Sequence, residues 1–288
     1  MPNVSVIIPT FDRAHLIEES VSSVLSQTFK PKEVIVVDDG SSDKTWDILK
    51  NLGFSLSESR KNTLRYIYKE NGGVSSARNI GIELSSSEYV ALLDSDDQWK
   101  PSKLEAQLSS LKKESFSCRV SHTNEIWIRN GIRVNQHKKH SKNGGDLFEK
   151  CLKMCCISPS SALIHRTVFN DLGGFDESLK ACEDYDFWLR YCAFEETHFL
   201  NEQLTIKNGG HSDQLSQKYW GMDRFRIYSL EKLLKNKNLS RSKYQLALTE
   251  LILKLKILMN GSMKRGKKDF TDKLNKKIIH FESLLGNA

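Results

Sequence analysis

The amino-acid sequence predicts an α/β fold, with a mixed, mostly parallel β-sheet flanked by helices and a helical extension toward the C-terminal end. Three observations support this prediction. Through the first 115 residues, short apolar runs alternate with amphipathic stretches, as they do in parallel sheets with helices on both faces. The apolar runs of this half end in clusters of polar residues. Beyond about residue 219 the apolar residues recur at helical spacing, which indicates helices.

The first half of the chain is expected to supply four strands, at residues 4–9, 33–37, 64–68 and 89–93. The stretch from Ala14 to Thr28 carries apolar residues three and four positions apart, so it predicts a helix with one buried face. Further helices are expected at 45–52, before Leu84, and from Pro101 onward.

From Phe116 onward the alternation changes. One or two strands are expected over residues 120–134, with a turn at Asn130-Gly131. A helix is expected over 146–154 and an extended segment over 160–164, followed by a helix that contains Glu183 and Asp184.

The composition is that of an ordinary soluble globular protein, with 39% hydrophobic and 27% charged residues. No apolar run approaches the ~20 residues of a membrane-spanning helix, and the first residues lack the features of a signal peptide. The six cysteines include no CxxC pair. We therefore expect reduced thiols and a cytoplasmic protein.

The acidic stretch after the strand at 89–93 is the first candidate for chemistry. Asp94, Asp96 and Asp97 follow the continuous apolar run from Val90 to Leu93. Close like charges raise one another's pKa, so this cluster is unfavourable without a positive partner. Mg²⁺ or Mn²⁺ is the natural partner, because both prefer oxygen ligands. The alternative is a solvated acidic turn, but open α/β sheets bind ligands at the carboxyl ends of their strands.

Two further polar clusters, at residues 10–13 and 38–41, follow two other strands. If the strands are parallel, all three clusters converge on one edge of the sheet. Asp38 or Asp39 can then accept a hydrogen bond from a base N–H, and Arg78 can donate to the base or to phosphates. The alternative for Arg78 is a surface ion pair, but its place after a double glycine at a helix start favours an anion. The pattern suits a nucleoside diphosphate, whereas the Rossmann and Walker fingerprints are absent.

Four segments together resemble the family 2 glycosyltransferases, which are inverting enzymes with a GT-A fold. They are residues 6–13 (VIIPTFDR), 36–43 (VVDDGSSD), 71–79 (NGGVSSARN) and 93–97 (LDSDD). The match covers roughly residues 3–115, and Gly173-Gly174-Phe175-Asp176 with Glu183-Asp184 extends it to about residue 190.

The resemblance implies roles for individual residues. Asp96 would ligate Mn²⁺ or Mg²⁺, and Asp94 would meet the ribose, or the metal through water. His211 is a further candidate metal ligand, because GT-A enzymes often bring a histidine back from this region; the alternative is an ordinary polar residue. The role of Asp97 stays open. The residues expected to bind the nucleotide are Pro9, Thr10, Phe11, Arg13, Asp38, Asp39, Arg78, Asp94 and Ser95.

The resemblance also implies a general base, because inversion by single displacement needs a carboxylate to take the acceptor's proton. Asp184 is the favoured base and Glu183 the second candidate. The alternative for this pair is an acidic helix N-terminus stabilised by the macrodipole. Asp186 lies two residues on, so on a helix it would point elsewhere.

The expected reaction moves a sugar from a nucleotide-diphosphate sugar, with UDP-sugars favoured, to a hydroxyl of a glycan or lipid-linked acceptor in polysaccharide assembly. No nucleic-acid partner is expected. One alternative is a non-catalytic GT-A module that only binds nucleotide sugar. The other is a sugar nucleotidylyltransferase, which would need a glycine-rich loop with Arg and Lys directly after the first strand; Pro9-Thr10-Phe11-Asp12 do not supply it.

The expected organisation is a glycosyltransferase domain over 1–220, with a nucleotide-binding half (1–115) and an acceptor half (116–220), followed by a basic helical extension (221–288). Residues 231–288 hold 14 Lys and Arg against 5 Asp and Glu, a net charge of +9, whereas residues 1–230 carry −2. Such an extension could contact an anionic membrane at its inner face. The alternative is a solvated lysine-rich helix without a partner.

Overall fold

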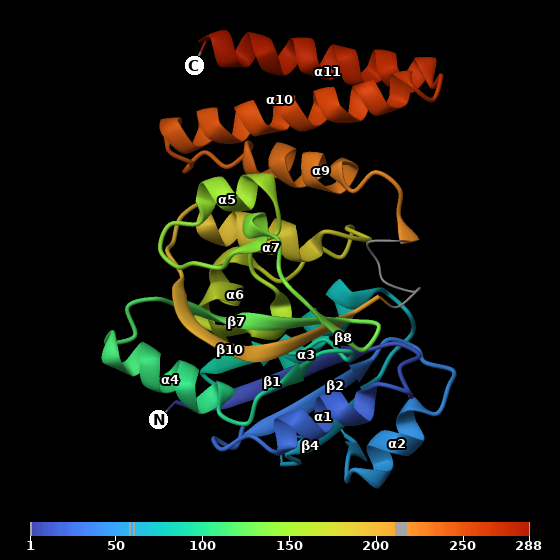
Figure 1. Ribbon diagram of the computed structural model, residues 1–288, viewed down its shortest axis with the longest axis vertical. Coiled ribbons are helices and arrows are strands. Elements are labelled where there is room, and N and C mark those ends of the chain that lie inside the picture. Colours follow the sequence, from blue (N-terminus) through green and yellow to red (C-terminus); the bar gives the residue numbers. More distant parts are fainter. Residues whose placement is uncertain (1, 58, 60, 211–217, 288) are drawn as a thin grey trace. The chain divides into compact units, whose positions relative to one another are not determined.

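The computed structural model describes residues 2–57, 59, 61–210 and 218–287, with the side chains of 286 and 287 excepted (Figure 1). Two compact units divide the chain, and each is discontinuous in sequence. The first comprises Met1–Gly145, Ile157–Ser178 and Glu196–Ser212, and the second Asp146–Cys156, Leu179–Glu195 and Asp213–Ala288. The functional boundary expected at residue 220 stays a prediction.

The first unit is built on one mixed sheet, which has ten strands over the described residues. The strands are β1 (Val4–Thr10), β2 (Glu33–Asp38), β3 (Ser55–Leu56), β4 (Leu64–Tyr68), β5 (Tyr89–Leu92), β6 (Gln98–Trp99), β7 (Val120–Arg129), β8 (Ile132–Val134), β9 (Ala162–His165) and β10 (His198–Gly209). Its helices are α1 (Ile17–Leu25), α2 (Thr45–Asn51), α3 (Val74–Leu84), α4 (Lys103–Lys113) and α6 (Thr167–Leu172), with short 3₁₀ turns η1 (Lys138–His140) and η2 (Pro159–Ser161).

The strand order is β3-β4-β2-β1-β5-β9-β7-β10-β6, with β8 paired to β7. The pairings from β3 to β5 are all parallel, whereas β9 is antiparallel to both β5 and β7. β1 and β2 are buried along their whole length, as continuous apolar strands of a parallel sheet must be. The α/β class with a mixed, mostly parallel sheet is therefore confirmed.

The register of the central strands aligns their carboxyl ends. Thr10 at the end of β1 pairs with Asp38 at the end of β2, and Asp38 pairs in turn with Tyr68 at the end of β4. The polar clusters after these strands consequently lie at one edge of the sheet, as the alternation of strands and helices predicts.

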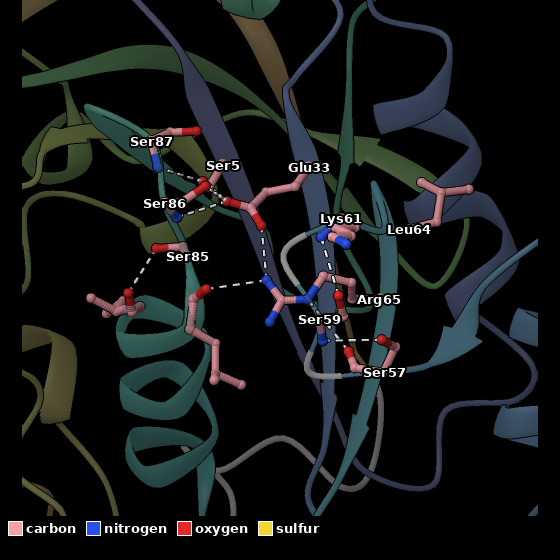
Figure 2. Close-up of polar contacts among 12 residues, drawn as sticks. Ser5, Glu33, Ser57, Ser59, Lys61, Leu64, Arg65, Ser85, Ser86 and Ser87 are labelled. Atoms are coloured by element: carbon pink, nitrogen blue, oxygen red, sulfur yellow. Dashed lines mark hydrogen bonds and ion pairs between the residues drawn. The ribbon is translucent and has the colours of Figure 1, made fainter.

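The opposite edge, at the amino ends of the strands, holds a buried ion pair (Figure 2). Arg65 Nη1 lies 2.8 Å from Glu33 Oε2, and neither side chain is appreciably exposed. Glu33 also accepts hydrogen bonds from Ser5 Oγ and from the backbone and hydroxyl of Ser86. Burial alone would raise the pKa of Glu33, but these hydrogen bonds and the one from Arg65 lower it. Both charges are thus satisfied within the protein, so this cluster joins three strands rather than forming a binding site.

The second unit is helical over its described residues: α5 (Phe148–Lys153), α7 (Glu183–Cys192), α9 (Asp223–Leu233), α10 (Arg241–Met263) and α11 (Lys268–Asn287). Its core includes Trp188 of α7, Leu251 and Leu255 of α10, and Leu274 and Ile278 of α11, all nearly or fully buried. The predicted C-terminal helices are confirmed. None of the described helices is long and apolar enough to cross a membrane.

Candidate functional site

The candidate site begins at the end of β1. Thr10 is buried, and its hydroxyl has no hydrogen-bond partner among the described residues. The next residue, Phe11, leaves the sheet with 46% of its surface exposed. A buried hydroxyl without a partner beside an exposed aromatic ring is the arrangement expected where a ligand supplies the missing contact.

Asp38 and Asp39 at the end of β2 are both buried, and both are bound by the protein itself. Asp38 accepts hydrogen bonds from the Ser41 backbone N–H (2.7 Å) and the Tyr66 hydroxyl (2.6 Å). Burial, and then this hydrogen bond to Asp38, raise the pKa of Tyr66. Asp38 therefore shapes the loop that follows β2.

Asp39 connects this loop to the double glycine before α3. Its carboxylate accepts from the backbone N–H groups of Gly72 (2.9 Å) and Gly73 (2.7 Å) and from Lys69 Nζ (2.5 Å). Gly73 adopts a φ of +94°, a conformation that favours glycine. A carboxylate offers about four acceptor positions, so a bond from a nucleobase to Asp39 stays a prediction.

Arg78, in the first turns of α3, is almost completely buried. Its Nη2 lies 2.7 Å from Asp94 Oδ1, and its guanidinium lies over the ring of Phe175 at 5.1 Å from the centroid. Arg78 thus forms an ion pair, as its alternative interpretation expects, but a buried one; its contact with an anionic ligand stays a prediction. This ion pair lies at the carboxyl ends of the strands, because β5 ends at Leu92 and only the buried Leu93 separates it from Asp94.

The motif at residues 173–176 places Phe175 against Arg78. Asn79 donates to the Phe175 carbonyl (2.9 Å) and accepts from its backbone N–H (2.8 Å). A Cβ on Gly174 would come within 2.2 Å of Asn79 Oδ1, so the close approach requires glycine. The double glycine was visible in the sequence, but the contact of Phe175 with Arg78 was not.

The acidic cluster lies in the loop after β5. Burial, and then the charge of Asp94, raise the pKa of Asp96; burial, and then the charge of Asp96, raise the pKa of Asp97 well above its ordinary value. Arg13 and Lys207 act in the opposite direction on Asp96. Ser95, between the acids, is buried and its carbonyl accepts from Ser20. The cluster therefore favours a bound cation, which would allow both carboxylates to ionise.

The end of β10 holds this acidic loop in place, which the sequence did not indicate. The Asn208 backbone N–H donates to Asp97 Oδ1 (2.9 Å), and its side chain donates to the Asp96 carbonyl (2.7 Å). Lys207, the preceding residue, donates to Ser158 Oγ (3.2 Å). Asp97 is fixed to the protein, whereas Asp96 is only half-buried and better placed to meet a ligand.

The residues present fit a Mg²⁺ or Mn²⁺ ion of the kind held largely by substrate. No group of three or more His, Cys, Asp or Glu side chains is arranged as a metal site within the described ranges. Mg²⁺ commonly needs only one or two carboxylates, with water and substrate phosphates completing its shell. Asp94 and Asp96 would supply such a pair. His211, the other candidate ligand, lies outside the described residues.

The candidate bases lie in the second unit, at the N-terminus of α7. Asp184 is half-buried, and its carboxylate accepts from the Tyr185 backbone N–H (2.7 Å) and from Cys155 Sγ (3.1 Å). Glu183 is buried. Asp186 is bound by Arg190 and Lys232, each at 2.8 Å, so its carboxylate is occupied as a structural group.

Among the remaining predicted residues, Pro9 pairs with Val37 within the sheet. The backbone N–H of Arg13 donates to Thr45 Oγ1 at 3.3 Å. The first unit thus brings Pro9, Thr10, Phe11, Arg13, Asp38, Asp39, Arg78, Asp94, Ser95 and Asp96 to the carboxyl edge of one sheet.

The sheet with these strand ends and the helices around it has the GT-A fold of nucleotide-sugar-dependent glycosyltransferases. Residues 5–173 match the family model described as glycosyl transferase family 2. The chain therefore belongs to that family, as its four motifs indicate.

Curated relatives agree with this assignment. An uncharacterized glycosyltransferase of Rickettsia typhi, RT0329, is 35% identical over 217 residues, covering 74% of this chain and 65% of that protein. The UDP-Glc:α-D-GlcNAc-diphosphoundecaprenol β-1,3-glucosyltransferase WfgD of Escherichia coli is 36% identical over 186 residues, covering 65% of this chain and 68% of WfgD. The chain thus spans just under two thirds of the Rickettsia relative's length.

Solved structures share the fold at low sequence identity. Residues 1–349 of TarS from S. aureus, in complex with UDP-GlcNAc, superpose with a TM-score of 0.68 at 23% identity, covering 86% of this chain and 71% of that one. The mannosyltransferase PcManGT from Pyrobaculum calidifontis, in complex with GDP-Man and Mn²⁺, gives a TM-score of 0.60 at 16% identity, covering 99% and 87%.

Proposed function

We propose that the protein is an inverting glycosyltransferase that transfers a sugar from a nucleotide-diphosphate sugar to a hydroxyl of a glycan or lipid-linked acceptor. The observation that carries the proposal is the convergence of Thr10, Asp39, Arg78 and the Asp94–Asp97 loop at the carboxyl ends of parallel strands. Ligands of open α/β sheets bind at this edge. Membership of glycosyl transferase family 2 supports the same reading.

The donor we favour is a UDP-sugar. WfgD is named for UDP-glucose, and the TarS structure was solved with UDP-GlcNAc. In this chain, Phe11 offers an exposed ring for the base, and Thr10 offers a buried hydroxyl with donor and acceptor capacity. Arg78 would contribute positive charge toward the nucleotide while Asp94 meets the ribose.

In the proposed reaction, the acceptor hydroxyl oxygen forms a bond to the anomeric carbon while the bond from that carbon to the diphosphate breaks. Asp184 takes the hydroxyl proton, and the nucleoside diphosphate leaves with the bonding electron pair. A divalent metal, when bound, stabilises the charge that develops on this diphosphate. Asp96 would hold it, with Asp94 contributing through water.

An acceptor carried on a lipid diphosphate, like the one in the name of WfgD, would bring the enzyme to a membrane surface. We propose a cytoplasmic protein in polysaccharide assembly whose C-terminal extension contacts anionic lipid. The charge of +9 on residues 231–288 supports this, because each basic residue near such a surface contributes ~1 kcal/mol.

A thermal-shift screen of nucleotide sugars with Mn²⁺ tests the proposed donor site. A ligand that binds only the native state raises the melting temperature, so we expect a shift with UDP-sugars that EDTA abolishes. Asp96→Ala should fold normally and lose most of this shift. Asp272→Ala, which removes an exposed acid on α11, serves as the charge-matched control. A full shift in the Asp96→Ala protein with Mn²⁺ present would show that Asp96 does not hold the metal.

The same proteins decide between an enzyme and a module that only binds nucleotide sugar. An enzyme should hydrolyse its donor slowly when no acceptor is present, releasing the nucleoside diphosphate. Metal-dependent binding without any release over many hours, with acceptor candidates present, would favour the non-catalytic module.

A further inference from the structure

The second unit contains a groove between α9, α10 and α11, the orange and red helices of Figure 1. Its volume is about 520 Å³, within the range of pockets that hold small ligands. Four half-buried apolar and aromatic side chains form its floor: Leu234, Tyr244, Phe281 and Leu284. The groove lies outside the proposed catalytic residues and has no role in the reaction described above.

Basic side chains surround this apolar floor. Lys235, Lys276, Lys277 and His280 line the groove and are exposed. Glu231 is the one carboxylate in the lining, and it pairs with Lys277 at 2.6 Å. Lys235 and Lys276 form no ion pair within the described part of the chain. The groove therefore presents two uncompensated positive charges beside apolar surface.

The surroundings of the groove resemble a membrane-facing surface. Tyr228 lies one helical turn before Glu231 on α9 and is 44% exposed; tyrosine is enriched at membrane–water interfaces. Long lysine side chains can keep their charge at headgroup level while their stems cover apolar surface. A soluble anion such as phosphate would satisfy the lysines but would leave the apolar floor exposed to water.

We propose that this groove binds one anionic phospholipid of a membrane surface, whose phosphate meets Lys235 and Lys276 and whose first acyl segment covers the apolar floor. The inference rests on the membrane contact proposed above and not on the catalytic assignments. It assigns the membrane contact to a defined lipid-binding site rather than to a general electrostatic attraction of the basic extension.

Flotation of the full chain with vesicles tests this proposal. We expect binding to phosphatidylcholine vesicles that contain phosphatidylglycerol and none to pure phosphatidylcholine. Neutralising the two rim lysines in Lys235→Gln/Lys276→Gln should weaken binding about thirtyfold, whereas neutralising two exposed lysines outside the lining, Lys237→Gln/Lys273→Gln, should weaken it less than about threefold. Both double variants change the net charge equally. Glycerol 3-phosphate at millimolar concentration should not compete.

Each other result overturns the proposal in a recognisable way. Equal losses in the two double variants would show a diffuse electrostatic contact without a groove site. Competition by glycerol 3-phosphate would show a phosphate site without a lipid chain. Equal binding to neutral vesicles, or no vesicle binding, would reject anionic lipid altogether. Donor binding, measured by thermal shift on the same preparations, reports separately on the proposed function.

Discussion

At the scale of single residues, the candidate site holds three neighbouring carboxylates whose negative charges the protein compensates to different degrees. Asp94 is neutralised by the buried Arg78, and Asp97 is fixed by the backbone of Asn208. Asp96 is left half-buried between them, with a raised pKa. A divalent cation and the diphosphate that accompanies it would complete this compensation, which is why we assign the metal to Asp96 rather than to Asp97.

The base assignment gives a prediction at this scale. Asp184→Asn should reduce transfer by roughly 10²-fold or more, the contribution expected of a general base. Donor affinity should be retained, because the base acts on the acceptor. Kinetics of the purified variant, with nucleotide binding measured alongside, check both parts.

Glu183→Gln is the matched control, since it removes the neighbouring carboxylate of the same helix. It should retain most of its turnover. If Glu183→Gln is inactive while Asp184→Asn works normally, the two roles are exchanged.

His122 on β7 gives a prediction on pH. It is fully buried, and burial, followed by the charge of Lys142, lowers its pKa from 6.5 to about 3. Between these values the unfolded chain binds the proton and the folded protein does not, so the free energy of unfolding decreases as the pH falls. From pH 7.5 to 5.0, wild type should lose about 2 kcal/mol more than His122→Gln. Denaturant unfolding at both pH values measures this, and identical losses would contradict it.

At the scale of elements, the packing around a helix decides whether a glycine in it can be replaced by alanine. Gly81 of α3 leaves no room for a side chain, because a Cβ would come within 2.3 Å of Ile7 Cγ2 on β1. Gly261 of α10 would meet only the flexible end of Arg265, at 3.0 Å. Both positions are helical, so helix propensity alone favours alanine at each.

We therefore predict opposite effects on stability. Gly81→Ala should destabilise the protein by about 1–2 kcal/mol, because overpacking outweighs the gain in helix propensity. Gly261→Ala should stabilise it by about 0.5–1 kcal/mol. Melting temperatures of the two variants measure this, and a stabilised Gly81→Ala protein would show that α3 can move away from β1.

The sequence predicted the elements best where local pattern and burial agree. The buried, mainly apolar strands β1, β2 and β5 and the helices between them lie at the expected places. It did not indicate the two-residue strands β3 and β6, which carry no periodic signal. Nor did it indicate that β9 inserts antiparallel between β5 and β7, because such long-range pairing leaves no local pattern.

The same limit applies to the site. Asp38, Asp39 and the Asp94–Asp97 cluster were predictable, because parallel strands place their carboxyl ends together. Phe175 and Asn208 were not, since each reaches the site through a contact across some 95 residues or more.

At the scale of the whole molecule, the chain enters the helical unit and returns to the unit with the sheet twice before its C-terminal helices. Residues 146–156 and 179–195 belong with α9, α10 and α11 rather than with the sheet. The proposed base Asp184 and the proposed lipid groove consequently belong to the helical unit, and the proposed donor site belongs to the unit with the sheet. This division suits an enzyme that recognises its donor and its acceptor with separate parts of one chain.

The most direct test of this account is to follow a UDP-sugar with Mn²⁺ by proton NMR. We predict that wild type releases UDP and forms, as first product, a sugar with inverted anomeric configuration. Asp184→Asn and Asp96→Ala should both suppress the resonances of this product. A first product of retained configuration would contradict the proposed single displacement. Failure to turn over any nucleotide sugar, with Mn²⁺ and acceptors present, would contradict the assignment as a glycosyltransferase.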